Sequence, residues 1–553
     1  AHRAGAGRAN PSVQENFVLK IWTSTKMGSA RNILFIMCAQ LRWDYLSCFG
    51  HPTIRTPNID ALARRGVRFT NAYVQSASCG PSRMSYYTGR YVTSHRSFGN
   101  FVALPVDELT LGDYLRPHGI RVAVDGKTHV EPDPTALRQR GIDPASAAGQ
   151  LLLEGGFEPF DRHDGVLADP HDEEARTNQY SNFLRQHGYV SENPWLDYAN
   201  SALGAGGEVL SGWHLRYADL PARVEERHSE TAYTTDRAIA FIAEQRDKPW
   251  CLHLSYIKPH WPYVAPSPYH QLYSARDVVP AVKSAGELVA PHPLYASYLR
   301  HQASVTFSQN ATRERVIPTY MGMITQIDDH LGRLFDSLKK SGRFDDTLVV
   351  FCSDHGDYLG DHHLGEKELW HDAAIKIPLI VYDPAEQAQA SRGSTCDALV
   401  EAIDLVPTFL DALQVEGPAN RLEGRSLLPW IRGYSAPEWR DFIVSEFDYS
   451  FRTATRRELG RSVRECRTIT LRDHKWKFIH CEGFRPLLFD LQADPQEFHD
   501  LAQEEALAPV IEHYSRELVS WLRARKTQTT VPDEFVDTWL EQSRFKGMKI
   551  GEW

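Results

Sequence analysis

Residues 79–90 combine groups that could perform nucleophilic chemistry on an anion. The run reads Cys-Gly-Pro-Ser-Arg-Met-Ser-Tyr-Tyr-Thr-Gly-Arg. Pro81 favours a first helical turn, where its missing N–H costs nothing. Cys79 is therefore predicted at a helix N-terminus, where free N–H groups favour an anion and acidify a thiol. A lone Cys is more often a buried structural residue, but the added charge of Arg83 and the complete run favour a reactive site.

Further polar residues follow apolar, strand-like segments elsewhere in the chain. In open α/β sheets, ligands bind beyond the carboxyl ends of the strands, so residues at these positions are candidates for one site. Each could instead be an ordinary surface or core residue, and their shared position is what strengthens the set. The candidates are Ala39, Gln40, Lys127, His129, Lys258, Pro259, His260, Ser353, Asp354, His355 and Gly356, with Lys367 further on.

The elements that must position these residues alternate between strands and helices. Apolar runs at 31–38, 347–352 and 377–382 indicate buried strands, and further strands are expected at 119–125 and 250–256. Helical patterns separate several of them, near 57–63, 79–88, 109–115, 228–246 and 315–341. This order predicts an α/β fold with a large, mostly parallel sheet flanked by helices.

The character of the chain changes after about residue 415. Short segments at 442–447, 467–471, 476–481 and 487–491 indicate antiparallel strands, and a helix is expected near 507–525. We therefore predict an α/β catalytic domain over 29–415, with an insertion at 131–225 that shapes an entrance. A smaller C-terminal α+β domain covers 416–525. Residues 1–28 are expected to be a polar leader or expression remnant, and 526–553 a tail.

Composition excludes several classes of protein. The chain has 553 residues, 42% hydrophobic and 24% charged, as in ordinary soluble globular proteins. A formal net charge of −10 argues against nucleic-acid binding, and no apolar stretch is long enough to span a bilayer. The eight Cys are scattered without a Cys-x-x-Cys pair, so no disulfide scaffold or zinc knuckle is indicated. We expect a cytoplasmic protein.

The run at 79–90 resembles the signature of the type I sulfatases, of the alkaline phosphatase superfamily. The resemblance extends to Thr56-Pro57-Asn58-Ile59-Asp60, Ser353-Asp354-His355-Gly356-Asp357 and Leu488-Phe489-Asp490-Leu491. Asn100, the segment 482–486 and the Ile550-Gly551-Glu552-Trp553 ending are similar to the branch that holds the phosphonate monoester hydrolases. The resemblance implies an alkaline-phosphatase-like fold. It also implies that Cys79 is oxidised to formylglycine, whose hydrate attacks a sulfate ester.

By position, the resemblance implies a role for each site residue. Gln40, Asp354, His355 and the modified Cys79 would hold one divalent cation. Oxygen ligands suit Ca²⁺, and the His ligand leaves Mn²⁺ open. The other implied roles are charge neutralisation of the sulfate by Lys127 and Lys367, contact with the nucleophile by Arg83 and His129, protonation of the leaving oxygen by His260, and a hydrogen bond from Asn100.

Two departures from the family pattern affect this reading. Lys127 and His129 stand where the phosphonate hydrolases carry Tyr and Thr, which favours sulfate esters as substrates. Ala39 stands where the family has a metal-binding Asp, and its methyl group cannot hold a cation. Because the other expected residues are present, we favour an intact site disabled at one ligand over a drifting pseudoenzyme.

The leading hypothesis is an arylsulfatase-like sulfuric ester hydrolase, impaired by Ala39. A phosphonate monoester or phosphodiester hydrolase and a non-catalytic binder of sulfate esters are the alternatives. The expected partners are a small-molecule sulfate ester, a formylglycine-generating enzyme and further copies in a homo-oligomer. Trp195, Trp213, Trp261 and Tyr263 could line a pocket for the organic part of the substrate, although such aromatics often only pack in the core.

Overall fold

The computed structural model describes residues 30–538, except 168, 172, 435–437, 533 and 537. The predicted leader at 1–28 and the Ile550-Gly551-Glu552-Trp553 ending therefore lie outside the described residues. Within these ranges no helix is long and apolar enough to cross a membrane.

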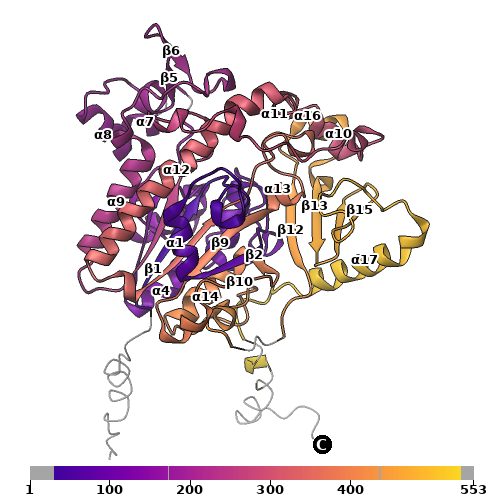
Figure 1. The fold of residues 1–553 in the computed structure, drawn as a ribbon. Coiled ribbons are helices and arrows are strands. Elements are labelled where there is room, and N and C mark those ends of the chain that lie inside the picture. Colours follow the sequence, from indigo (N-terminus) through magenta and orange to yellow (C-terminus); the bar gives the residue numbers. More distant parts are fainter. Residues whose placement is uncertain are drawn as a thin grey trace, which may run out of the picture.

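A nine-stranded sheet crosses the centre of the described structure (Figure 1). Its strands are β1 (Asn32–Cys38), β2 (Val67–Tyr73), β3 (Arg121–Gly126), β4 (Glu158–Arg162), β7 (Trp250–Tyr256), β8 (Thr347–Ser353), β9 (Lys376–Tyr382), β10 (Thr395–Cys396) and β11 (Val400–Glu401). The order is β10-β2-β9-β8-β1-β7-β3-β4, with β11 also beside β2. β9 runs antiparallel to β8 and β2, and the other pairs are parallel. The prediction of a mostly parallel sheet is confirmed.

Helices bury both faces of this sheet, which explains the continuous apolar strands. Along β1, Phe35 and Met37 belong to one core cluster, and Leu34 and Ile36 belong to the other. The second cluster is covered by α1 (Pro57–Arg65), α9 (Glu230–Glu244) and α12 (Asn310–Lys340). The first is covered by α2 (Cys79–Thr88), α4 (Leu111–Leu115) and α14 (Leu405–Ala412).

The segment 131–225 forms a separate small layer above one end of the sheet, at the top left of Figure 1. It contains α5 (Pro134–Gln139), α6 (Ala147–Leu153), α7 (Glu173–Thr177), α8 (Gln179–Gln186), a π-helix (Trp195–Ala199) and the hairpin of β5 (Ser201–Leu203) and β6 (Val209–Ser211). Tyr180, Leu184 and Trp195 belong to its own small core. Strand β4 also falls in this segment but pairs with β3, so part of the segment extends the main sheet.

The C-terminal strands form a second, antiparallel sheet. Its order is β12 (Ile443–Asp448), β13 (Arg467–Arg472), β14 (Trp476–Cys481) and β15 (Leu487–Asp490). Helix α17 (Ala508–Arg523) packs on it through Tyr514, Leu518 and Trp521. The buried Lys477 links the sheet to the larger domain, because its Nζ donates to Asp372 at 2.6 Å. The smaller helices are α3 (Val92–His95), α10 (Pro293–Leu299), α11 (Gln302–Phe307), α13 (Asp372–Ile375), α15 (Leu428–Ile431) and α16 (Thr453–Glu458).

Candidate active site

Cys79 is the first residue of α2, as predicted, and the helix is buried along its whole length. Asn100 caps this N-terminus from another loop: its Oδ1 accepts the Gly80 N–H at 2.8 Å and the Ser78 hydroxyl at 3.1 Å. A Cβ on Gly80 would lie 3.0 Å from the Asn100 Cα, so glycine allows this close approach. Asn100 therefore positions the helix that presents Cys79.

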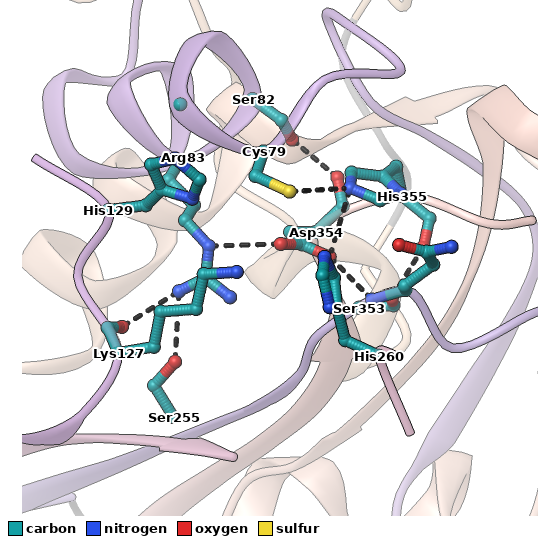
Figure 2. A network of polar contacts seen from close by, with 12 residues as sticks. Cys79, Ser82, Arg83, Lys127, His129, Ser255, His260, Ser353, Asp354 and His355 are labelled. Atoms are coloured by element: carbon teal, nitrogen blue, oxygen red, sulfur yellow. Dashed lines mark hydrogen bonds and ion pairs between the residues drawn. The ribbon is translucent and has the colours of Figure 1, made fainter. Parts of the chain in front are cut away.

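The thiol of Cys79 lies among cationic and imidazole groups. Its Sγ is 3.1 Å from His355 Nε2 and 3.4 Å from Lys367 Nζ, and Figure 2 shows it pointing toward His355. Burial opposes ionisation, but the charges of Lys367 and Lys127 outweigh it and hold the pKa of Cys79 well below its usual value. The surroundings thus stabilise an anion at this position.

Asp354 lies at the carboxyl end of β8 and is held on both oxygens. Oδ1 accepts the backbone N–H of Gln40 at 2.8 Å, and Oδ2 accepts Arg83 Nε at 2.9 Å. Although burial favours the neutral acid, His355 and Arg83 lower the pKa of Asp354 to about 2. Arg83 also donates to the Lys127 carbonyl and to Ser255 Oγ, as Figure 2 shows. These contacts join the carboxyl ends of four neighbouring strands, β8, β1, β7 and β3.

Two ammonium groups flank the thiol in different ways. Lys127 is 1% exposed, and its Nζ has no hydrogen-bond partner among the described residues. Burial lowers its pKa, as expected for a cation without a counter-ion in contact. Lys367 Nζ instead contacts Gln40 Oε1 at 2.8 Å and His260 Nε2 at 3.3 Å. An anionic ligand beside the nucleophile would supply the hydrogen-bond partner and counter-charge that the buried Lys127 ammonium lacks.

Both candidate histidines lie close to Cys79. His129 has a left-handed backbone with φ 52°, and it is one of the groups that lower the pKa of the Cys79 thiol. His260 Nδ1 is 2.7 Å from the Trp261 carbonyl oxygen, so this nitrogen carries the proton. Burial and the charges of Lys367 and Lys127 hold the pKa of His260 well below its usual value. Without an anionic ligand, His260 is therefore neutral.

Cys79, Asp354 and His355 could share one metal ion, because one ligand atom from each lies within 4.8 Å of the others. The thiol, carboxylate and imidazole suit a divalent cation. Ala39 is fully buried beside them and offers only a methyl group. The Gln40 side chain faces Lys367 and Asp357. Cys79, Asp354 and His355 therefore fit a cation, but Asp354 is the single carboxylate among them to balance its charge.

Asp357 belongs to the site although no role was predicted for it. Its Oδ2 accepts Gln40 Nε2 at 2.5 Å and the Tyr263 hydroxyl at 2.9 Å. The only signal in the sequence was its place at the end of the run 353–357. Ser255 was missed because it is the next-to-last residue of β7 and looked like part of an ordinary buried strand.

Two adjoining cavities lie beside the site. One of about 530 Å³ has mainly apolar walls that include Trp213, Trp261, Tyr263 and Phe307. The other, of about 570 Å³, reaches Lys367. Trp195 lines neither: it is buried in the small core and donates to Glu230 at 2.6 Å. The predicted aromatic pocket is thus present without Trp195.

Comparison with known proteins identifies the family. Residues 31–415 match the Sulfatase family. The chain is a member of the sulfatase family. Residues 360–524 also match the family described as N-sulphoglucosamine sulphohydrolase, C-terminal. The predicted type I sulfatase resemblance is confirmed.

Relatives of this sulfatase-family chain include enzymes with different names. It is 32% identical to the multifunctional alkaline phosphatase superfamily protein PehA of Trinickia caryophylli, over 90% of this chain and 96% of the relative. It is 27% identical to an arylsulfatase of Clostridium perfringens, over 90% and 95%. The phosphonate monoester hydrolase of Agrobacterium radiobacter has a similar structure, with a TM-score of 0.78, 30% identity and coverage of 90% and 97%. The predicted branch is therefore confirmed.

Proposed function

We propose that this sulfatase-family chain hydrolyses sulfate esters, with residue 79 carrying the nucleophile. The observation that supports this most strongly is the pair of ammonium groups beside Cys79, one of them buried and unpaired. A sulfate group placed against residue 79 would take up the unmet charge of Lys127. The Lys127 and His129 pair, in place of Tyr and Thr, supports sulfate over phosphonate.

Cys79 would be converted to formylglycine by a separate maturing enzyme that supplies the oxidant. Once hydrated, residue 79 would present an oxygen that attacks the sulfur of the ester, with the S–O bond to the organic group breaking. Lys127 and Lys367 would stabilise the charge on the sulfuryl oxygens, since fixed cations in a buried site need no reorganisation. Arg83 would hold Asp354 and the N-terminal turn of α2 in place.

His260 would give its proton to the departing oxygen. In the described structure it is neutral because burial and the charges of two lysines hold its pKa well below the usual value. An incoming sulfate would offset those charges and allow His260 to take up a proton, so that acid catalysis becomes available only with substrate bound.

Asp354, His355, Gln40 and residue 79 would hold a Ca²⁺ or Mn²⁺ ion. When bound, such an ion would add positive charge against the nucleophile and the sulfate. With Ala39 in place of a carboxylate, we propose that this site binds metal weakly and that turnover is correspondingly impaired.

Hydrolysis of phosphonate or phosphate diesters is the second candidate. The names of the structurally similar phosphonate monoester hydrolases favour it. A binder that retains sulfate esters without turnover is the third, and Ala39 favours it.

Hydrolysis of paired esters decides among these functions. The chain is produced with a maturing enzyme, and 4-nitrophenyl sulfate is compared with the 4-nitrophenyl ester of phenylphosphonate. We expect the sulfate to react faster, and Lys127→Ala to lower kcat/KM by about 10²–10³-fold. Lys475→Ala is the matched control, because Lys475 is exposed and remote from the site. Faster phosphonate hydrolysis would overturn the preference, and binding without turnover in both the unsubstituted and the Ala39→Asp chains would support the third function.

A further inference from the structure

We propose that the cleft beside Lys367 selects esters whose organic group carries a cationic nitrogen, and that Glu366 sets this preference. This inference rests on the proposed function, because it concerns the part of the ester that departs. It names a substrate class and a specificity residue that the family resemblance does not supply.

The position of the cleft follows from its walls. The two cavities share Trp261, Gln302, Ala303 and Glu366, so they adjoin along these residues. Lys367 lines the inner cavity, next to Cys79. The ring of His260 lies 4.1 Å from that of Trp261, centre to centre. A group that leaves beside His260 therefore enters this space against Trp261.

Aromatic rings enclose the outer part of the cleft. The rings of Trp213 and Trp261 are 5.5 Å apart and inclined at 58°, and Tyr263 and Phe307 lie 6.1 Å apart in the same lining. Inclined rings form a pocket in which a cation meets more than one electron-rich face. Trp261 already lies near one cation, because Lys367 Nζ is 5.7 Å from its centre. These rings suit a flat or rounded organic group and attract positive charge.

Glu366 is the unmatched charge in this space. In the part of the chain that the structure describes, its carboxylate has no hydrogen bond or ion pair. The cations that act on it are Lys367 and Arg452. The contacts of Lys367 Nζ go to Gln40, Cys79 and His260, and Arg452 is paired with Glu368. Burial raises the pKa of Glu366, consistent with a carboxylate that lacks a partner in contact.

The other charged or titratable side chains of the lining do not supply a second unpaired carboxylate. Glu368 is paired with Arg452. His214 and Arg216 are exposed at the outer edge, where water screens them. The backbone of Glu366 has a left-handed φ of 67°, and its carbonyl accepts the Tyr358 N–H at 2.7 Å. The loop therefore holds this carboxylate in the cleft at some conformational cost.

A pair of esters of matched shape tests the charge preference directly. We compare 4-(trimethylammonio)phenyl sulfate with 4-tert-butylphenyl sulfate, which differ in charge but hardly in size. Their Kd values for the unmodified Cys79 chain are measured by calorimetry at pH 8, so no turnover is needed. We expect the cationic ester to bind roughly tenfold more tightly, as for a partly desolvated cation beside aromatic rings and a carboxylate.

Two variants separate the carboxylate from the rings. Glu366→Gln should bring the ratio of the two Kd values close to one and leave the neutral ester unchanged. Trp213→Leu should weaken both esters, the cationic one more. Glu504→Gln, at an exposed position in the C-terminal domain, should retain the full ratio.

The outcomes are distinguishable. Equal binding of the two esters, or a ratio that survives Glu366→Gln, would overturn this inference and leave the proposed function standing. Failure of both esters to bind would overturn this inference, whereas the proposed function is decided separately by the hydrolysis assay on the matured chain. If Glu366→Gln loses the Kd ratio but also has a lower melting temperature, the loss could come from destabilisation. Trp213→Leu then decides, because our inference requires its Kd ratio to fall as well.

Discussion

Ala39→Asp should restore tight metal binding and hydrolysis. Ala39 is fully buried, directly before Gln40, whose backbone N–H holds Asp354 at 2.8 Å. An Asp side chain there would place a second carboxylate next to Cys79, Asp354 and His355. The expected effect is large because Cys79, Asp354 and His355 together offer a divalent ion only one carboxylate.

The magnitude follows from the charges. Two unit charges 4 Å apart interact by about 4 kcal/mol at an effective dielectric constant of 20, and a divalent ion doubles this. Desolvation of the new buried carboxylate reduces this favourable interaction energy by several kcal/mol. A net gain of about 3–4 kcal/mol remains, which corresponds to roughly 10²–10³-fold in Kd. Without metal the new charge faces Asp354, so the variant should lose about 1–3 kcal/mol of stability.

Calorimetric titration with Mn²⁺ and Ca²⁺ measures the Kd, and thermal melting with and without metal measures the stability change. Ala39→Asn is the matched control, because it adds the same volume and an oxygen but no charge. It should gain far less affinity than Ala39→Asp. If Ala39→Asp binds both metals no better than the unsubstituted chain and stays inert, the idea of a single missing ligand is refuted.

Three further outcomes are expected. Co-expression with a maturing enzyme should lower the intact mass by about 18 Da, the change from thiol to aldehyde at Cys79; an active preparation with a fully unmodified Cys79 would contradict this. In the Ala39→Asp chain, His260→Ala should slow alkyl sulfates far more than nitrophenyl sulfate, whereas Lys127→Ala should slow both alike, because only a basic leaving oxygen needs the proton. Burial raises the pKa of Glu446 to about 7, so the folded state binds its proton more tightly than the unfolded state. Stability should therefore fall as the pH rises from 5 to 8, by about 3 kcal/mol at most, and Glu446→Gln should flatten that fall in urea unfolding curves.

The main strands and helices could be predicted because each carries its own periodic signal. Strand β1 is apolar from its second residue onward because both of its faces are covered, and α2 begins at Cys79, two residues before Pro81. β9 shows the limit of such signals. Its apolar run predicted a buried strand, but its direction depends on the path of the chain from β8, and it runs antiparallel. Similarly, β4 is short and only partly buried, so the sequence carries little periodic signal for a strand of the main sheet there.

Sequence motifs identify residues at fixed places next to a strand or helix. They do not show which side chains from separate segments come into contact in the folded protein. Cys79, Asp354 and His355 could be found because each follows a strand or begins a helix. The link from Asp357 to Gln40 and Tyr263 depends on three separate segments, and the unpaired state of Glu366 depends on where every neighbouring cation points. The residues of the proposed sulfate chemistry thus lie at motif positions, whereas those of the proposed preference for the organic group lie on loops that converge around Trp261. For this reason the reaction class could be predicted from the sequence, and the preference for a cationic ester could be inferred only from the structure.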